Sequence, residues 1–311
     1  MAALAVDGLL GEPPVAVHPV VLMGRAITFY EGRALALKSG SSQRIAGLVL
    51  AVSLPVLVFV LTRGLLALVP RELRAVTEVL LLSTAVSMRG LGEAASAVGR
   101  ELETGSLGGA RACLGEFVGR DTAGMTEGDV SRAAIESVAE NTSDGIVAPM
   151  FYGLLLGAPG ALAYKAVNTM DSMVGHQTPI HGDLGLGPAR LDDAANFLPS
   201  RFTALAAAAS SGRFGHAWEI SRSHGPLTKS PNAGWAEASF AGSLGLVLGG
   251  TNSYGGVARK GPALGVGRPP EARDITRAVR LMRGSCALIL LVFFGLAAVR
   301  DAIAAPGPGR G

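Results

Sequence analysis

The chain has 311 residues, of which 49% are hydrophobic and 16% are charged, and its formal net charge is +3. Soluble domains carry about 25% charged residues, so this composition argues against an ordinary soluble protein. No basic cluster is interleaved with aromatic residues, which argues against a nucleic-acid partner. The two cysteines are far apart in sequence, which argues against a disulfide framework or a cysteine zinc site.

Long apolar segments predict helices that cross a membrane. Residues 45–62 and 285–299 contain no charge and are bracketed by arginines, and the first approaches the roughly 20 residues that a bilayer requires. Residues 146–167 are apolar except for Lys165 and contain prolines, which predicts a segment that spans or re-enters the membrane. The segment 76–88 is shorter and contains an acid, so it is expected to be partly buried or interfacial.

The remaining segments predict polar or short elements. Residues 89–130 have helical spacing and a charged face, which predicts a soluble helical hairpin broken at 105–109. Thr126 is expected to begin a further helix, because acids follow it in the first turn. Shorter elements are an alanine-rich helix at 202–211, an apolar segment at 239–250, a Gly/Pro loop at 261–270 and a disordered tail at 306–311.

The predicted fold class is all-α, because no repeat and no alternating strand pattern is visible. We expect a polytopic integral membrane helical bundle whose polar loops form a site at the membrane edge. Residues 1–305 are expected to form one membrane-embedded domain, with the soluble hairpin as an insertion.

Three carboxylates share one face of a predicted helix that leads into an apolar segment. Glu136, Glu140 and Asp144 are spaced i, i+4 and i+8, which places them on one side of a helix. Like charges at this spacing repel one another unless a cation lies between them. Mg²⁺ prefers such oxygen ligands and keeps waters for substrate phosphates. A cation site is therefore one interpretation, and a solvated acidic face is the other.

A second polar group follows in a Gly/Pro-rich stretch. It contains Asn168, Asp171, His176, His181 and Asp183. The run 182–187 superficially suggests a phosphate loop, but no GK[ST] follows and no strand precedes it, so nucleotide binding by that route is poorly supported. The spacing of the two histidines does not match HExxH, which argues against a zinc protease.

A third polar region comprises 223–226 and 230–235, flanked by Arg222 and Lys229. The chain contains no G-x-S-x-G elbow, so a serine nucleophile is poorly supported. The prolines in this region favour a stiff loop that holds substrate, and an inert loop is the alternative interpretation.

Several stretches, taken in this order, resemble the CobD or CbiB family, adenosylcobinamide-phosphate synthase of cobalamin biosynthesis. They are DGLLGEPP with HPVVLMGR, ESVAENTSDGIVAPMFYGLLLGAPGALAYKAVNTMDSMVGH, LDDAANFLPSR and HGPLTKSPNAGWAEASFAGSLG. The resemblance extends from about Asp7 to Val299. The chain departs from the family pattern in its shorter first apolar segment, and it lacks a standard ATP-binding fingerprint.

The resemblance implies a multi-pass enzyme of the cytoplasmic membrane that acts late in the corrin pathway. Such a carbon–nitrogen ligase joins (R)-1-amino-2-propanol, free or as its O-phosphate, to a propionate carboxylate of adenosylcobyric acid, and it uses ATP with Mg²⁺. The implied partners are these substrates, the lipid bilayer and other late corrin-pathway membrane enzymes. The rival is a membrane corrinoid transporter or binding protein without catalysis, because intramembrane acids and histidines also mark transport pathways.

Activation of a carboxylate by phosphoryl transfer requires cations and positioned groups, which suggests roles for the polar residues. The expected ligands of Mg²⁺ and nucleotide are Glu136, Glu140, Asp144 and Asp171. Glu140 and Asp171 are also expected to be essential for catalysis, and His176 or His181 is expected to be the base for the attacking ammonium. The expected substrate-binding residues are Lys165, Asn168, Arg190, His224, Lys229 and Asn232.

Overall fold

The computed structural model describes residues 2–10, 18–37, 39–175 and 181–304, so the predicted tail at 306–311 lies outside the described residues. Its helices are α1 (Ala2–Leu10), α2 (Pro19–Leu35), α3 (Gly40–Leu68), α4 (Arg71–Ser83), α5 (Met88–Glu103), α6 (Leu107–Gly115), α7 (Glu127–Thr142), α8 (Ala148–Val174), α9 (Leu186–Ala195), α10 (Phe197–Ser210), α11 (Phe214–His224), α12 (Ala233–Leu244) and α13 (Ala272–Ala304). A π-helical turn, η1 (Ser143–Val147), joins α7 to α8, a 3₁₀ turn, η2 (Gly225–Leu227), follows α11, and one hairpin is formed by β1 (Leu248–Tyr254) and β2 (Val257–Leu264). The predicted helical bundle is confirmed.

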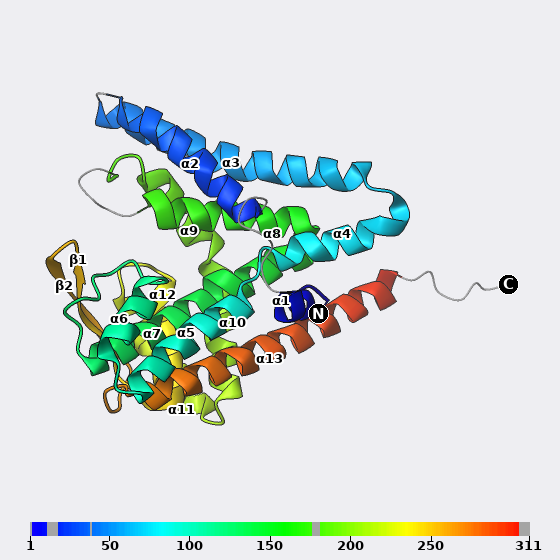
Figure 1. Cartoon of the computed structure of the whole chain (residues 1–311). Helices are drawn as coiled ribbons and strands as arrows, with labels where there is room; N and C mark the ends of the chain where they lie inside the picture. The colour runs from blue at the N-terminus through cyan, green and yellow to red at the C-terminus, as the bar shows by residue number, and fades with distance from the viewer. Residues whose placement is uncertain (1, 11–17, 38, 176–180, 305–311) are drawn as a thin grey trace.

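Within the described residues, three helical stretches are long and apolar enough to cross a membrane: Gly40–Leu68, Glu127–Val174 and Ala272–Leu296. They include the predicted span 45–62 and most of the predicted span 285–299. In Figure 1, α3 runs along the top of the molecule, α13 along its lower edge and α8 between them. Large apolar side chains of α3 remain exposed along its length, which is the arrangement that lipid favours and water does not.

The helix α8 is broken within its apolar part. Gly157 has a positive φ of 69°, and the Glu78 Oε1 atom of α4 accepts a hydrogen bond from the Ala158 N–H at 3.3 Å. This contact satisfies a backbone donor that the break releases. The segment 76–88 was expected to be partly buried or interfacial. Most of its residues are half-buried, which confirms partial burial, and its helix already ends at Ser83.

The predicted helical hairpin is present as α5 and α6, with Gly105 (φ 78°) at the break. Its first helix buries Leu91 and Ala95 and contacts α7 and α13, so the hairpin packs into the main bundle. The predicted helix start at Thr126 is confirmed by a capping box. The Asp129 carboxylate accepts from the Thr126 N–H at 3.1 Å, and the Thr126 hydroxyl accepts from the Asp129 N–H at 3.2 Å.

The all-α class is confirmed, and β1 and β2 add one small antiparallel hairpin for which the sequence shows no strand pattern. The hairpin buries Leu248 and Leu264 at its base and leaves most other residues exposed or half-buried. The sequence therefore shows no alternation of apolar and polar residues, and the predicted loop at 261–270 begins as part of β2. The glycine pair at 255–256, with φ of 58° and 78°, forms the turn. Figure 1 shows the hairpin at the end of the molecule away from the α3–α4 connection.

Helix α3 packs against the segment before α9 with no space for a side chain at Gly47. A Cβ atom there would meet the carbonyl of Leu184, which is fully buried. Gly47→Ala is therefore expected to lower the free energy of unfolding by about 1–3 kcal/mol, because the helix or the segment must shift. Thermal unfolding in detergent measures this. Gly64→Ala in the same helix has no neighbour within 4 Å and should leave the midpoint unchanged; equal losses in both variants would contradict the explanation.

Candidate functional site

Glu136 of α7 is buried, and both of its carboxylate oxygens are occupied. Oε2 accepts a hydrogen bond from Arg120 Nη1 at 2.6 Å, and Oε1 accepts from the Gly249 N–H at 2.7 Å. Arg132 Nη1 also lies 3.4 Å from Oε1. Glu136 thus ties β1 and the α6–α7 loop to α7, and its predicted role as a Mg²⁺ ligand would compete with these donors.

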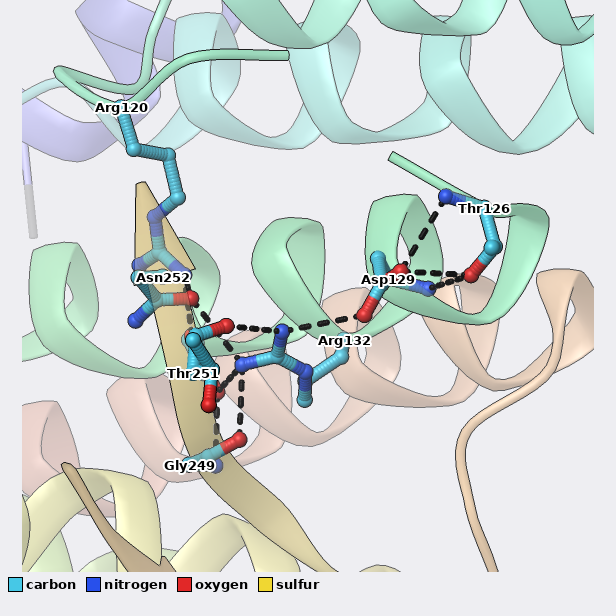
Figure 2. A network of polar contacts seen from close by, with 8 residues as sticks. Arg120, Thr126, Asp129, Arg132, Gly249, Thr251 and Asn252 are labelled. Atoms are coloured by element: carbon cyan, nitrogen blue, oxygen red, sulfur yellow. Dashed lines mark hydrogen bonds and ion pairs between the residues drawn. The ribbon is translucent and has the colours of Figure 1, made fainter. Parts of the chain in front are cut away.

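The two arginines extend this network into the hairpin. Asn252 Oδ1 accepts from Arg120 Nη1 at 2.9 Å and from Arg132 Nη1 at 3.1 Å. Arg132 also donates to two β1 carbonyls at 2.7 and 3.0 Å. Figure 2 shows these side chains between α7 and β1, with the capping pair of Thr126 and Asp129 at one end. The α6–α7 loop, α7 and the distant strand β1 therefore meet at Glu136 and Asn252.

Two further acids lie beside this network. Glu140 follows Glu136 by one turn of α7 and is within electrostatic range of Arg120 and Asp171. Glu237 comes from α12, where burial and the charges of Glu136 and Glu140 raise its pKa well above the ordinary value. Helices α7, α8 and α12 therefore bring the predicted Glu140 and Asp171 together with Glu237, an acid to which no role was assigned from the sequence.

Asp192 of α9 is a buried acid with one carboxylate oxygen that lacks a hydrogen-bond partner among the described residues. Its side chain is buried, and its Oδ2 accepts from Asn196 Nδ2 at 2.9 Å, whereas Oδ1 has no hydrogen-bond partner within the described part of the chain. Burial and the charge of Asp171 raise the pKa of Asp192 to about 7, and the amides of Asn196 and Asn168 act in the opposite direction. The Tyr164 hydroxyl donates to Asn196 Oδ1 at 2.8 Å. Because Tyr164 belongs to α8, two helices set the orientation of Asp192.

Asp144 lies in η1, where α7 passes into α8. It is within electrostatic range of Asp192, Glu140 and Lys165. Lys165 Nζ in turn lies 3.4 Å from Asn168 Oδ1. π-Helical turns occur often at functional sites, because the extra residue changes which side chains share a face. The predicted Asp144, Lys165 and Asn168 therefore belong to the same region as Asp192.

We refer to the interacting carboxylates as the acidic cluster: Glu140, Asp144, Asp171, Asp192 and Glu237. Arg120 and Lys165 lie within electrostatic range, and the carboxyl groups of the cluster outnumber these two cations. Among the described residues, no three His, Cys, Asp or Glu side chains are already placed around one metal position. Oxygen ligands and the unsatisfied Asp192 Oδ1 nevertheless fit Mg²⁺, which completes its shell with water and substrate phosphates.

The predicted residues that follow α8 contact other elements. His181 Nε2 pairs with Glu31 Oε1 of α2 at 2.6 Å, and Asp183 Oδ1 accepts from Arg44 Nε of α3 at 2.6 Å. These contacts hold the segment before α9 against α2 and α3. His176 lies outside the described residues. The choice of His176 or His181 as base stays a prediction.

The predicted substrate-binding residues around α12 differ in their surroundings. Asn232 is buried, and its Nδ2 donates to the Asp193 carbonyl at 2.7 Å, which places it next to the acidic cluster. His224 Nδ1 accepts from the Gly265 N–H at 2.9 Å and so holds the end of the hairpin. Arg190 and Lys229 are exposed.

Three residues of the site were not assigned a role from the sequence: Arg120, Asp192 and Glu237. The two adjacent acids of LDDAANF were a usable signal for Asp192. Consecutive side chains on a helix point in different directions, so one of the two acids is expected to face the protein interior when the other faces solvent. Arg120 lies in a loop, 16 residues before its partner Glu136, and Glu237 stands alone among small and apolar residues. Their sequence neighbourhoods give no comparable signal.

The comparisons with known proteins indicate one family. The family model described as CobD/Cbib protein matches residues 1–282. Several relatives are named "Cobalamin biosynthesis protein CobD". That of Klebsiella pneumoniae is 40% identical over 94% of this chain and 95% of the relative. Those of Geobacter metallireducens and Halalkalibacterium halodurans are 42% and 38% identical, respectively, over 94% of this chain and 94% of the relative. No solved structure matches. The chain therefore belongs to the CobD/CbiB family.

Proposed function

We propose that this protein acts in cobalamin biosynthesis as an ATP-dependent ligase of the cytoplasmic membrane. It would join (R)-1-amino-2-propanol, or its O-phosphate, to a propionate carboxylate of adenosylcobyric acid. Membership of the CobD/CbiB family and the names of the relatives support the pathway. The helices long enough to cross a membrane support the location. We expect the site to face the cytoplasm, where ATP and the corrinoid are found.

The observation that carries the proposal is the unsatisfied Asp192 Oδ1 within the acidic cluster. A buried carboxylate oxygen without a donor is costly, and Asp171 and Asp144 add like charge around it. A cation held by Glu140, Asp144, Asp171 and Asp192 would offset both costs. Mg²⁺ bound in this way would neutralise the phosphates of ATP.

The proposed reaction consists of two transfers. A carboxylate oxygen of the corrinoid attacks the γ-phosphorus of ATP, which forms an acyl phosphate and releases ADP. The amine nitrogen then attacks the acyl carbon. The C–N bond forms, the C–O bond to phosphate breaks with its electron pair leaving on the phosphate, and the nitrogen loses its proton to a base. Such transfers depend on positioning and on charge neutralisation more than on a protein nucleophile.

Individual residues would supply these requirements. Lys165, held beside Asn168, is proposed to meet a phosphate or the corrinoid carboxylate. Asn232, which joins the loop before α12 to the backbone of Asp193, is proposed to hold substrate next to the acidic cluster. His181, or His176, is the proposed base for the amine.

The experiment that tests the proposal uses the purified protein in detergent with adenosylcobyric acid, ATP, Mg²⁺ and either aminopropanol or its O-phosphate. We expect a product heavier by one condensed donor in mass spectrometry, and we expect its loss when ATP or Mg²⁺ is omitted. Corrinoid binding without product from either donor would contradict ligation. Uptake of corrinoid into vesicles, without amide formation, would instead indicate a carrier.

Charge removal within the acidic cluster tests the residues. Glu140→Gln and Asp171→Asn each keep the side-chain volume and remove one negative charge, so we expect ligation to fall about 100-fold or more while the unfolding midpoint is maintained. Glu127→Gln, an exposed acid in the first turn of α7, is the matched control and should keep its activity. Full activity of both cluster variants would show that these acids have no part in the reaction.

A further inference from the structure

Arg201, near the start of α10, contacts two aromatic rings beside the loop that precedes α12. Its guanidinium carbon is 3.9 Å from the centroid of the Phe197 ring and 4.7 Å from that of the Trp235 ring. Nη1 donates to Asn232 Oδ1 at 2.6 Å, and Nη2 donates to the Pro231 carbonyl at 3.0 Å. These contacts fix the plane of the guanidinium, so little freedom is left to lose when a ligand binds.

The charge of Arg201 is not matched by an acid in the described part of the chain. Its other hydrogen bonds go to the Phe197 carbonyl at 2.9 Å and the Ser200 hydroxyl at 3.0 Å, and its Nε donates to no described residue. Burial lowers the pKa of Arg201, and no carboxylate offsets this. Arg120, by contrast, pairs directly with Glu136. A rigid, half-buried arginine without a counter-ion is arranged to receive an anion.

The position of Arg201 connects it to the acidic cluster. Asn232 accepts from Arg201 through Oδ1 and donates through Nδ2 to the Asp193 carbonyl. One amide side chain therefore separates the guanidinium from the backbone next to Asp192. The exposed Lys229 belongs to the same loop as Asn232. Positive charge thus borders the acidic cluster on this side, where a phosphate could face a cation in the cluster and a guanidinium at once.

We propose that Arg201 binds a phosphate group of a substrate, with its Nε–H and its remaining Nη2–H as donors. The proposal rests on the proposed ligation, in which two substrates carry phosphate: ATP and the O-phosphate of the amine donor. Both present the same charged oxygens to a guanidinium, so separate binding measurements are needed to identify the source.

Isothermal titration of the whole chain in detergent tests this, with Mg²⁺–ATP, aminopropanol O-phosphate and free aminopropanol as separate ligands. Arg201→Gln should lower the affinity for one phosphorylated ligand about 10- to 100-fold, because a charge-assisted hydrogen bond is lost. The affinity for free aminopropanol should not change. Arg201→Lys keeps the positive charge but not the planar pair of donors, so its affinity for that ligand should fall less than that of Arg201→Gln. Arg259→Gln makes the same charge change on the exposed hairpin and should bind as the wild type does.

The outcomes separate this proposal from the ligation itself. A wild-type protein that binds neither phosphorylated ligand and forms no product overturns both. A wild-type protein that ligates, with unchanged affinity for both phosphorylated ligands in Arg201→Gln and Arg201→Lys, overturns only the role of Arg201. If the Arg201 variants lose only the stabilisation that nanodiscs of anionic lipid give the wild type, and keep their affinity for both phosphorylated ligands, Arg201 binds a lipid headgroup. That result would also overturn its role in binding substrate phosphate. If Arg201→Gln does not fold, the fold-change of Arg201→Lys decides.

Discussion

Asp192→Asn is expected to make the protein more stable at pH 8 and to abolish ligation. In the folded protein, burial and the charge of Asp171 raise the pKa of Asp192 to about 7, whereas an aspartate in an unfolded chain titrates near pH 3.9. Ionisation of Asp192 therefore opposes folding increasingly between about pH 4 and pH 7, and the cost is constant above that range. Asparagine keeps an oxygen for the hydrogen bond from Asn196 but carries no charge. It therefore avoids the cost of ionising Asp192 in the folded protein, which reaches up to about 4 kcal/mol of folding free energy at pH 8.

Thermal unfolding at pH 5 and pH 8 checks this, because the stability gained by Asp192→Asn should grow with pH. Mg²⁺ should raise the unfolding midpoint of the wild type at pH 8 and leave that of the variant nearly unchanged. The adjacent Asp193, which is partly exposed, provides the control Asp193→Asn, and we expect little change there. A variant with the same pH dependence as the wild type would show that the pKa of Asp192 is not raised.

Glu136→Gln is expected to have the opposite effect on stability. The substitution removes the charge that Arg120 and Arg132 share, and the side chains of both arginines are only 12% exposed. Removing one partner of a buried ion pair typically costs about 3–5 kcal/mol, because the remaining charge stays buried and unmatched. The attachment of the hairpin to α7 should weaken but persist, because glutamine has one acceptor oxygen for the donors that both Glu136 oxygens now serve, while Arg132 still donates to two β1 carbonyls.

Denaturant or thermal unfolding, with hydrogen exchange of β1, measures the loss for Glu136→Gln. Asp129→Asn is the control, because Asp129 pairs with the same Arg132 but is 42% exposed. Asparagine keeps an oxygen for the capping bond from the Thr126 N–H, so the variant should cost less than about 1 kcal/mol. Mg²⁺ should still stabilise Glu136→Gln if Glu136 is a structural anchor. Loss of the Mg²⁺ effect with little loss of stability would instead support the predicted ligand role.

The pair of variants distinguishes two uses of a buried carboxylate. Glu136 is surrounded by donors that stabilise its charge, so its removal weakens the fold. Asp192 has one oxygen without a donor and lies near other acids, so its ionisation lowers the free energy of unfolding. A residue that costs stability in the unliganded protein is the type expected where a cation or substrate later supplies the missing partner.

The sequence by itself was sufficient for features that depend on neighbouring residues in the chain. The spans at 45–62 and 285–299 follow from length and absence of charge, which are local properties. The helix start at Thr126 and the break near Gly105 follow from capping and backbone preferences, which are also local. The hairpin of β1 and β2 was missed because only its base is buried, so its strands carry no periodic signal.

Tertiary structure decided which polar residues share a site and what each can do there. Glu136 and Glu140 have the same residue type and helical spacing, yet Glu136 meets Arg120 and Gly249, which lie 16 and 113 residues away in sequence. Asp192 gains its raised pKa only because α9 places it beside Asp171 in a buried position. Burial, charge neutralisation and hydrogen-bond satisfaction are properties of the surroundings in space. Spacing along one helix therefore proposes candidates, and packing between helices assigns their roles.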